Sequence, residues 1–132
     1  MTTPVVLDAS AGVEILLLTP AGRRLLAQLP LDAEEWVPEL YFAEVAAVLR
    51  RGAIHARFPL PRIEAALSRL LTAPVRRVKV RPLLREAWSM RQNLTVADAV
   101  YVVMARQLES PLVTADLRLA ATPGLAVSTV VP

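Results

Sequence analysis

Four acidic residues stand where a charged side chain is costly, because each one ends or interrupts an apolar run. A carboxylate in apolar surroundings must be hydrogen-bonded, paired with a cation or bound to a metal ion. Any fold of this chain must therefore supply partners for all of them. They are Asp8 after the run 5–7, Glu44 within 40–49, Asp98 before 99–105, and Asp116 after 112–114.

Short apolar or β-branched runs alternate along the chain with segments of helical periodicity. This alternation predicts an α/β fold in which helices cover both faces of a parallel sheet. The 132 residues show no linker or internal repeat, so residues 1–132 are expected to form a single domain. Strands are expected over 5–8, 75–80, 111–114 and 126–131, a polar loop over 30–37, and helices over 11–18, 22–29, 38–51, 82–91 and 95–109, with one more starting at Pro59 or Pro61.

The acids are expected to meet at one edge of this sheet. Asp8 and Asp116 end strand-like runs, and the carboxyl ends of parallel strands form the edge where ligands bind. The helices that carry Glu44 and Asp98 would deliver the other two carboxylates. Clustered carboxylates raise one another's pKa, and a divalent cation relieves their repulsion. Oxygen ligands favour Mg²⁺ or Mn²⁺, whereas zero Cys and one His argue against zinc.

Each acid also has a simpler interpretation. Asp8 and Asp116 stand where helix caps are common. Thr95 and Asp98 fit a capping box, in which the acid reaches back to the first residue of the helix. For Glu44 the alternative is an ion pair with an arginine in the last turn of its helix. Singly, the three aspartates favour capping, but together the four acids favour one pocket.

Other polar residues flank the expected pocket. Ser10 lies two residues after Asp8, and Thr114 lies two residues before Asp116. Both hydroxyls are suited to orienting a carboxylate or a water molecule, and Ser10 fits equally well as the N-cap of the helix over 11–18. Arg91 and Asn93 precede the helix of Asp98, so we expect them at the mouth of the pocket, where they suit a phosphate group.

Composition adds three limits. The net charge of +3 is only weak support for nucleic-acid binding. No apolar run is long enough to span a bilayer, and the absence of cysteine fits a reducing cytoplasm, so we expect a cytoplasmic protein without a membrane segment. The hydrophobic fraction of 55% is high for a small domain, which predicts an exposed apolar patch and a protein partner.

Taken together, the motifs resemble those of a PIN domain, and more closely a VapC-type toxin of a VapBC toxin–antitoxin pair. The resemblance covers nearly the whole chain. No single motif is specific, but their order and separation are. They are Val-Leu-Asp-Ala-Ser at 6–10, the segment 38–46 around Glu44, Leu-Thr-Val-Ala-Asp-Ala-Val-Tyr-Val at 94–102, and Pro-Leu-Val-Thr-Ala-Asp at 111–116.

This resemblance implies a three-layer α/β/α sandwich with a short central parallel sheet and a metal-dependent endoribonuclease activity. It maps Asp8, Glu44, Asp98 and Asp116 onto the family's four acids, with RNA as the substrate. The three aspartates would hold one Mg²⁺ or Mn²⁺, with Glu44 binding it directly or through water, and a second ion could arrive with the substrate. Relatives often carry Tyr before the third acid and Asn three residues after the helical Glu. This chain has Ala97 and Ala47 at those positions. We therefore expect the residues that support the metal site, and the choice of substrate, to differ from those of such relatives.

The same resemblance names the expected partners, a cognate antitoxin and a second copy of the chain in a homodimer or larger hetero-oligomer. An amphipathic antitoxin segment would lie in an apolar groove between two helices, although about half of the groove residues must belong to the core. The groove is expected to be lined by Tyr41, Phe42, Val45, Val48, Leu49, Ile63 and Leu67.

Two other classes of function remain open. One is a non-catalytic PIN-like module that binds RNA or protein, against which the intact set of four acids argues. The other is a metal-dependent phosphatase or a phospho-receiver, which also places acids at strand ends. The phosphatase expects a second Asp two residues after Asp8, where this chain has Ser10, and the receiver expects a Lys after Asp116, where none occurs.

Overall fold

The computed structural model describes every residue from Met1 to Pro132. Its centre is a sheet of five parallel strands in the order β3-β2-β1-β4-β5. The order places β1 in the middle, so the strand that leads into Asp8 has a neighbour on each side. The strands are β1 (Thr3–Leu7), β2 (Ala33–Pro38), β3 (Arg76–Val78), β4 (Leu112–Val113) and β5 (Thr129–Val130).

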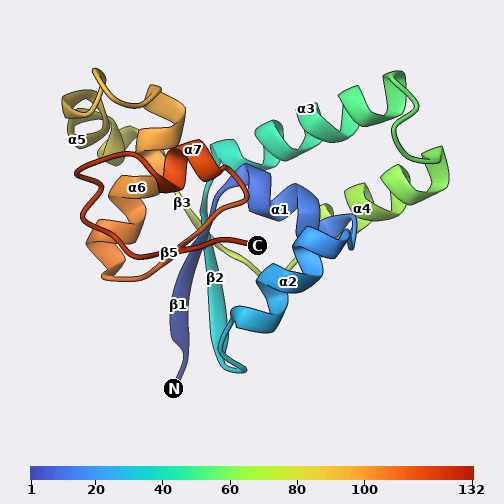
Figure 1. The fold of residues 1–132 in the computed structure, drawn as a ribbon, viewed down its shortest axis with the longest axis horizontal. Helices are drawn as coiled ribbons and strands as arrows, with labels where there is room; N and C mark the ends of the chain where they lie inside the picture. Colours follow the sequence, from blue (N-terminus) through green and yellow to red (C-terminus); the bar gives the residue numbers. More distant parts are fainter.

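Helices cover both faces of the sheet, which confirms the α/β/α sandwich (Figure 1). One group lies together on one side and contains α1 (Ala9–Leu16), α2 (Pro20–Gln28), α3 (Leu40–Ile54) and α4 (Leu60–Thr72). The pair α3 and α4 extends outward from the sheet. The other side holds α5 (Leu84–Ser89), after a 3₁₀ turn over Arg81–Leu83, and α6 (Val96–Leu108), while the short α7 (Leu117–Ala120) follows β4. None of these helices combines the length and apolar character needed to cross a bilayer.

The core forms where α6 packs against β1, β2 and β4. Every residue from 99 to 105 of α6 is buried, as expected for a helix that is apolar on all sides. The last three residues of β1 are also buried, because a central parallel strand has helices over both faces. Asp98 in the first turn of α6 and Asp8 after β1 are therefore attached to the most deeply buried part of the molecule.

The expectation of a loop over 30–37 is wrong, because residues 33–38 form β2. This strand pairs with β1 on one side and β3 on the other, which satisfies its backbone groups. The first four residues of β2 are only half-buried. Glu34, one of them, accepts a hydrogen bond from Trp36 Nε1 at 3.0 Å and forms a salt bridge with Arg76 at 3.3 Å. Pairing on both sides outweighs the low strand propensity of acidic residues.

Several element ends also differ from expectation. The N-cap of α1 is Asp8 rather than Ser10, because the Asp8 carboxylate accepts a hydrogen bond from the Ala11 N–H. Helix α2 begins at Pro20, with Thr19 as its cap, two residues before the expected start. Helix α3 continues past Gly52 to Ile54. The strands expected over 75–80, 111–114 and 126–131 are shorter, with bounds Arg76–Val78, Leu112–Val113 and Thr129–Val130.

The close approach of α1 and α2 generates a stability prediction. A Cβ added at Gly22 would lie 2.1 Å from the backbone oxygen of Glu14, and backbone cannot easily move away. We expect Gly22→Ala to lower the free energy of unfolding by about 1–3 kcal/mol, as overpacking does in other cores. Gly52→Ala is the matched control, because its Cβ meets only side-chain atoms, the tip of Ile63 at 3.3 Å and the Phe58 ring at 3.9 Å. Equal stability of the two variants in urea unfolding would contradict this packing.

Candidate active site at the carboxyl edge of the sheet

The structure brings the four acids to the carboxyl edge of the sheet. Asp8 directly follows β1, and Asp116 is the N-cap of α7 just beyond the neighbouring strand β4. Glu44 lies in the second turn of α3, which follows β2, and Asp98 lies in the first turn of α6. Segments that are far apart in sequence thus deliver one carboxylate each.

Asp8 is the most firmly held of these acids. It is only 5% exposed, and both of its carboxylate oxygens accept hydrogen bonds. Oδ1 accepts from Ser10 Oγ at 2.7 Å and from the Ala11 N–H at 2.9 Å, and Oδ2 accepts from Thr114 Oγ1 at 2.5 Å. Burial raises the pKa of Asp8, and these hydrogen bonds oppose the rise.

Ser10 and Thr114 join the two strand ends to each other. Ser10 Oγ accepts a hydrogen bond from the Ala115 N–H at 2.9 Å, and Thr114 Oγ1 accepts one from the Asp116 N–H at 3.0 Å. Because each hydroxyl also donates to Asp8, its single proton is already used. The geometry therefore suits both residues to orienting the Asp8 carboxylate.

Glu44 is bound to Tyr101, a partner that sequence reasoning missed. The Tyr101 hydroxyl donates to Glu44 Oε1 at 2.5 Å, and no arginine of α3 pairs with Glu44. Tyr101 lies three residues after Asp98 on α6, so α6 supplies both a carboxylate and a support for another. A Tyr within a buried helix needs a hydrogen-bond partner, and this was the available signal. Burial raises the pKa of Glu44, the hydrogen bond opposes the rise, and the charges of Asp98 and Asp8 add to it.

Asp98 completes only half of the expected capping box. Its N–H donates to Thr95 Oγ1 at 3.1 Å. Burial raises the pKa of Asp98, against the effect of the Thr95 hydroxyl, and the charge of Asp116 raises it further, while the charge of Arg118 lowers it. Asp116 accepts hydrogen bonds through Oδ1 from the N–H groups of Arg118 and Leu119, at 3.0 and 3.2 Å. Its capping role is thus real and leaves Oδ2 available.

The acids lie close enough for their charges to act on one another, and none of them forms a salt bridge with a basic side chain. Asp98 is coupled to each of the other three, and Glu44 is also coupled to Asp8. The only salt bridges of the chain are elsewhere, between Arg76 and Glu34 and between Arg77 and Glu39. As the side chains stand, no group of three or more His, Cys, Asp or Glu residues is placed to hold a metal ion. The donor set fits a hard divalent cation chemically, since it offers only oxygen ligands and negative charge that no salt bridge compensates.

A cavity of about 230 Å³ opens beside Asp98 and Asp116. Asn93 lines it, as expected for a residue at the mouth of the site, and Arg118 lines it as well, which sequence reasoning missed. Arg91 is absent from its lining. The Arg91 guanidinium lies 5.2 Å from the Trp88 ring centroid, and its Nη1 donates to the Trp88 carbonyl at 3.2 Å.

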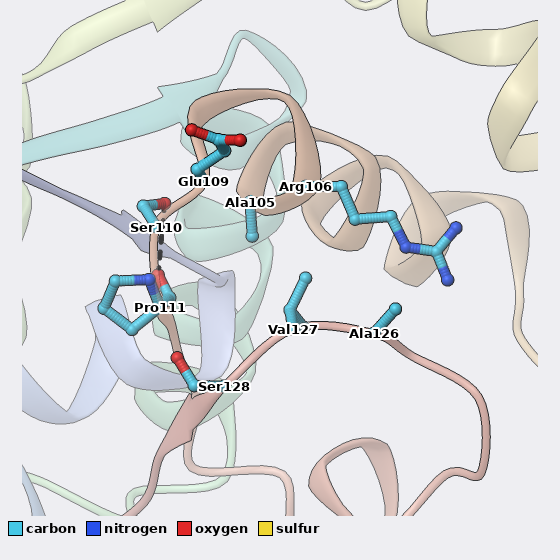
Figure 2. Close-up of a pocket in the computed structure, with 8 residues that line it drawn as sticks. All are labelled: Ala105, Arg106, Glu109, Ser110, Pro111, Ala126, Val127 and Ser128. Carbon is cyan, nitrogen blue, oxygen red and sulfur yellow. Dashed lines mark hydrogen bonds between the residues drawn. The ribbon is translucent and has the colours of Figure 1, made fainter.

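A larger cavity, of about 390 Å³, lies at the opposite edge of the sheet. Figure 2 shows its lining, which comes from the end of α6, the start of β4 and the segment that leads into β5. Arg106 already donates to the carbonyl oxygens of Leu125 and Gly124, at 2.7 and 2.9 Å, and Glu109 is the only carboxylate. This cavity contains none of the four acids and no arrangement of groups for catalysis.

The residues expected to form an apolar groove divide between core and surface. Tyr41, Val45, Leu49 and Ile63 are buried, and Tyr41 packs over Gly12 of α1, where an added Cβ would lie 2.2 Å from its hydroxyl. Phe42 and Val48 are half-buried, and Leu67 is 39% exposed. A small apolar cavity of about 130 Å³ remains between α1, α3 and α4, and Val48, Leu49 and Ile63 line part of it.

Comparison with known proteins agrees with this arrangement. The family model described as PIN domain matches residues 5–125. Ribonuclease VapC12 of Mycobacterium tuberculosis is 35% identical over 120 residues, which is 91% of this chain and 92% of the relative. The solved structure of M. tuberculosis VapC20, a toxin that cleaves the sarcin-ricin loop, superposes with a TM-score of 0.69 at 19% identity and covers 97% of this chain and 99% of that one.

A toxin–antitoxin complex from Klebsiella pneumoniae also contains a chain of this fold. Its TM-score is 0.66 at 15% identity, and 97% of each chain is covered. The family match extends from the end of β1 to the segment before β5, and therefore includes all four acids. The chain thus belongs to the PIN-domain family, in the branch of the VapC proteins.

Proposed function

We propose that this chain is an endoribonuclease that uses Mg²⁺ or Mn²⁺ to hydrolyse RNA phosphodiester bonds and acts as the toxin of a toxin–antitoxin pair. The observation that carries the proposal is the set of four carboxylates at one sheet edge, three with raised pKa values and none in a salt bridge. Relatives named ribonuclease at 35% identity over nearly the whole chain support it.

In this proposal Asp8, Glu44, Asp98 and Asp116 hold the divalent ion, which when bound supplies the Lewis-acid chemistry of phosphodiester hydrolysis. The hydrogen bonds to both oxygens keep Asp8 in place. No three acids are gathered as they stand, so the less constrained carboxylates would have to move for all four to hold one ion. Asp116 Oδ1 caps α7, and Oδ2 would remain available to the ion.

The residues around the acids hold the proposed metal ligands in place. Ser10 and Thr114 fix the Asp8 carboxylate, and Tyr101 fixes that of Glu44 through its hydroxyl. Groups held in this way need little reorganisation when the reaction begins, which is the main source of electrostatic catalysis. In the overall reaction, water adds to phosphorus and one P–O ester bond breaks, so that one product ends in a phosphate and the other in a hydroxyl group.

The proposed partner is a cognate antitoxin, because a solved relative of this fold is a toxin–antitoxin complex. The chain exposes apolar side chains on α4, with Leu67 39% and Leu71 74% exposed, and Leu71 lines a cavity of about 330 Å³ together with the half-buried Phe42 of α3. An amphipathic segment would cover these residues, while the buried members of the expected groove support them from below. We further propose a homodimer that assembles with the antitoxin in the cytoplasm, where the RNA substrate lies.

Cleavage tests this function directly. The purified chain is expected to cleave RNA in the presence of Mn²⁺ or Mg²⁺, and this cleavage is expected to stop when EDTA is added. Asp98→Asn should lower the rate at least about a hundredfold, since a metal ligand contributes several kcal/mol to the transition state. Glu64→Gln is the control, because Glu64 is an exposed carboxylate on α4 without a partner. Full activity of a folded Asp98→Asn protein would rule out this site, and RNA binding without cleavage by the unaltered chain would favour the non-catalytic module.

The raised pKa values predict how stability depends on pH. Protons bind Asp8, Glu44 and Asp98 more strongly in the folded chain than in the unfolded one. Without metal, stability should therefore rise as the pH falls from about 7 toward 5, because the folded state then takes up more protons. Mg²⁺ should reverse this trend, since it binds only the ionised carboxylates.

Thermal unfolding in EDTA and in Mg²⁺ measures both trends. Asp98→Asn should show a shallower dependence on pH in EDTA, because one of the groups with a raised pKa is removed. A metal-free chain that loses stability on mild acidification, or a variant with an unchanged slope, would contradict the assignment.

A further inference from the structure

One basic side chain faces the cavity beside the acids. Arg118 lines this cavity of about 230 Å³ together with Asp98 and Asp116, and no other lysine, arginine or histidine does so. The backbone of Arg118 is held on both sides: its N–H donates to Asp116 Oδ1 at 3.0 Å, and its carbonyl accepts from Thr122 Oγ1 at 2.9 Å. The side chain is therefore attached to a fixed point next to a proposed metal ligand.

The guanidinium of Arg118 has no partner within the chain. It takes part in none of the side-chain hydrogen bonds, and the salt bridges join other residues. Its charge lowers the pKa of Asp98, but the two groups do not form a salt bridge. By contrast, the guanidinium groups of Arg62, Arg69 and Arg106 bond to backbone carbonyl oxygens. Arg118 thus keeps its donors free for a group that enters the cavity.

We propose that Arg118 binds a phosphate of the RNA next to the bond that is cut, an inference that rests on the proposed function. RNA approaching the site meets the negative charges of four carboxylates, and one divalent ion compensates for only two of them. An arginine is always charged and binds a phosphate through two parallel N–H donors. Arg118 is the only side chain in this lining with that chemistry.

A second cavity lies beside the one that Arg118 lines. This cavity, of about 210 Å³, shares Asn93, Leu94 and Thr122 with the first and extends to Ser89 and Gly124. The two cavities are therefore neighbours, and Asn93, whose side-chain amide makes no hydrogen bond within the chain, lines both. Arg91 lines neither part and is held against Trp88. The phosphate contact that the sequence suggested for Arg91 is better placed at Arg118.

The test is binding of a fluorescein-labelled, single-stranded RNA of mixed sequence in EDTA, followed by anisotropy at several salt concentrations. Arg118→Gln is expected to raise Kd about tenfold. It should also make the slope of log K against log salt shallower by about 0.7, as for the loss of one phosphate contact to a single strand. Arg118→Lys keeps the charge but loses the paired donors, so its Kd should lie between those of the unaltered chain and Arg118→Gln.

Matched controls lose the same charge elsewhere. Arg23→Gln removes an exposed arginine on α2 that lines no described cavity, and its Kd should change less than about twofold. Arg91→Gln tests whether the phosphate contact belongs to Arg91 instead.

With Mn²⁺ present, the rate of cleavage by Arg118→Gln at low RNA concentration should fall by about the same factor as RNA affinity, and it should recover as the RNA concentration is raised. Circular dichroism melting confirms that each variant folds.

The outcomes separate this inference from the proposed function. If the unaltered chain cuts RNA while Arg118→Gln binds RNA as Arg23→Gln does, the inference is overturned and the nuclease assignment stands. A loss confined to Arg91→Gln overturns it as well. If the unaltered chain binds RNA through Arg118 without cutting it, the inference holds and the nuclease assignment fails. If the chain neither binds nor cuts RNA, both are wrong.

Discussion

The structure depends on the hydrogen bonds that hold the Asp8 carboxylate between two strand ends. Thr114 donates to it from beyond β4 at 2.5 Å, and Ser10 donates from α1 at 2.7 Å. The same two hydroxyls accept from the backbone of the loop that carries Asp116. A carboxylate that is 5% exposed would be costly without these partners. One buried group therefore fixes the start of α1, the path of the chain after β4 and the floor of the candidate site.

The other acids are held less firmly, and this difference suits a site that takes up a cation. Glu44 has one hydrogen bond, from Tyr101, and Asp98 and Asp116 line an open cavity. A bound ion or protons would relieve their mutual repulsion. In the proposed metal site, metal affinity, pH dependence and stability would therefore be linked through the same carboxylates.

The pattern of apolar residues along the sequence correctly predicted the elements that lie in the core. The apolar runs before Asp8 and Asp116 and the apolar helix after Asp98 lie in the core, as expected. Residues 33–38 were missed as a strand because pairing with β1 and β3 outweighs their acidic composition. The positions of the four acids were predictable from strand ends and family resemblance. Tyr101 and Arg118 were not, because their roles depend on which surfaces face the acids, and sequence spacing alone does not reveal that.

Titration of Mn²⁺ into the chain, followed by calorimetry and by the electron paramagnetic resonance of the free ion, tests the central claim most directly. If the four acids form one cation site, the unaltered chain binds Mn²⁺ and Asp98→Asn loses at least about tenfold in affinity, while Glu64→Gln binds as the unaltered chain does. Absence of binding, or equal binding by Asp98→Asn, would contradict the account.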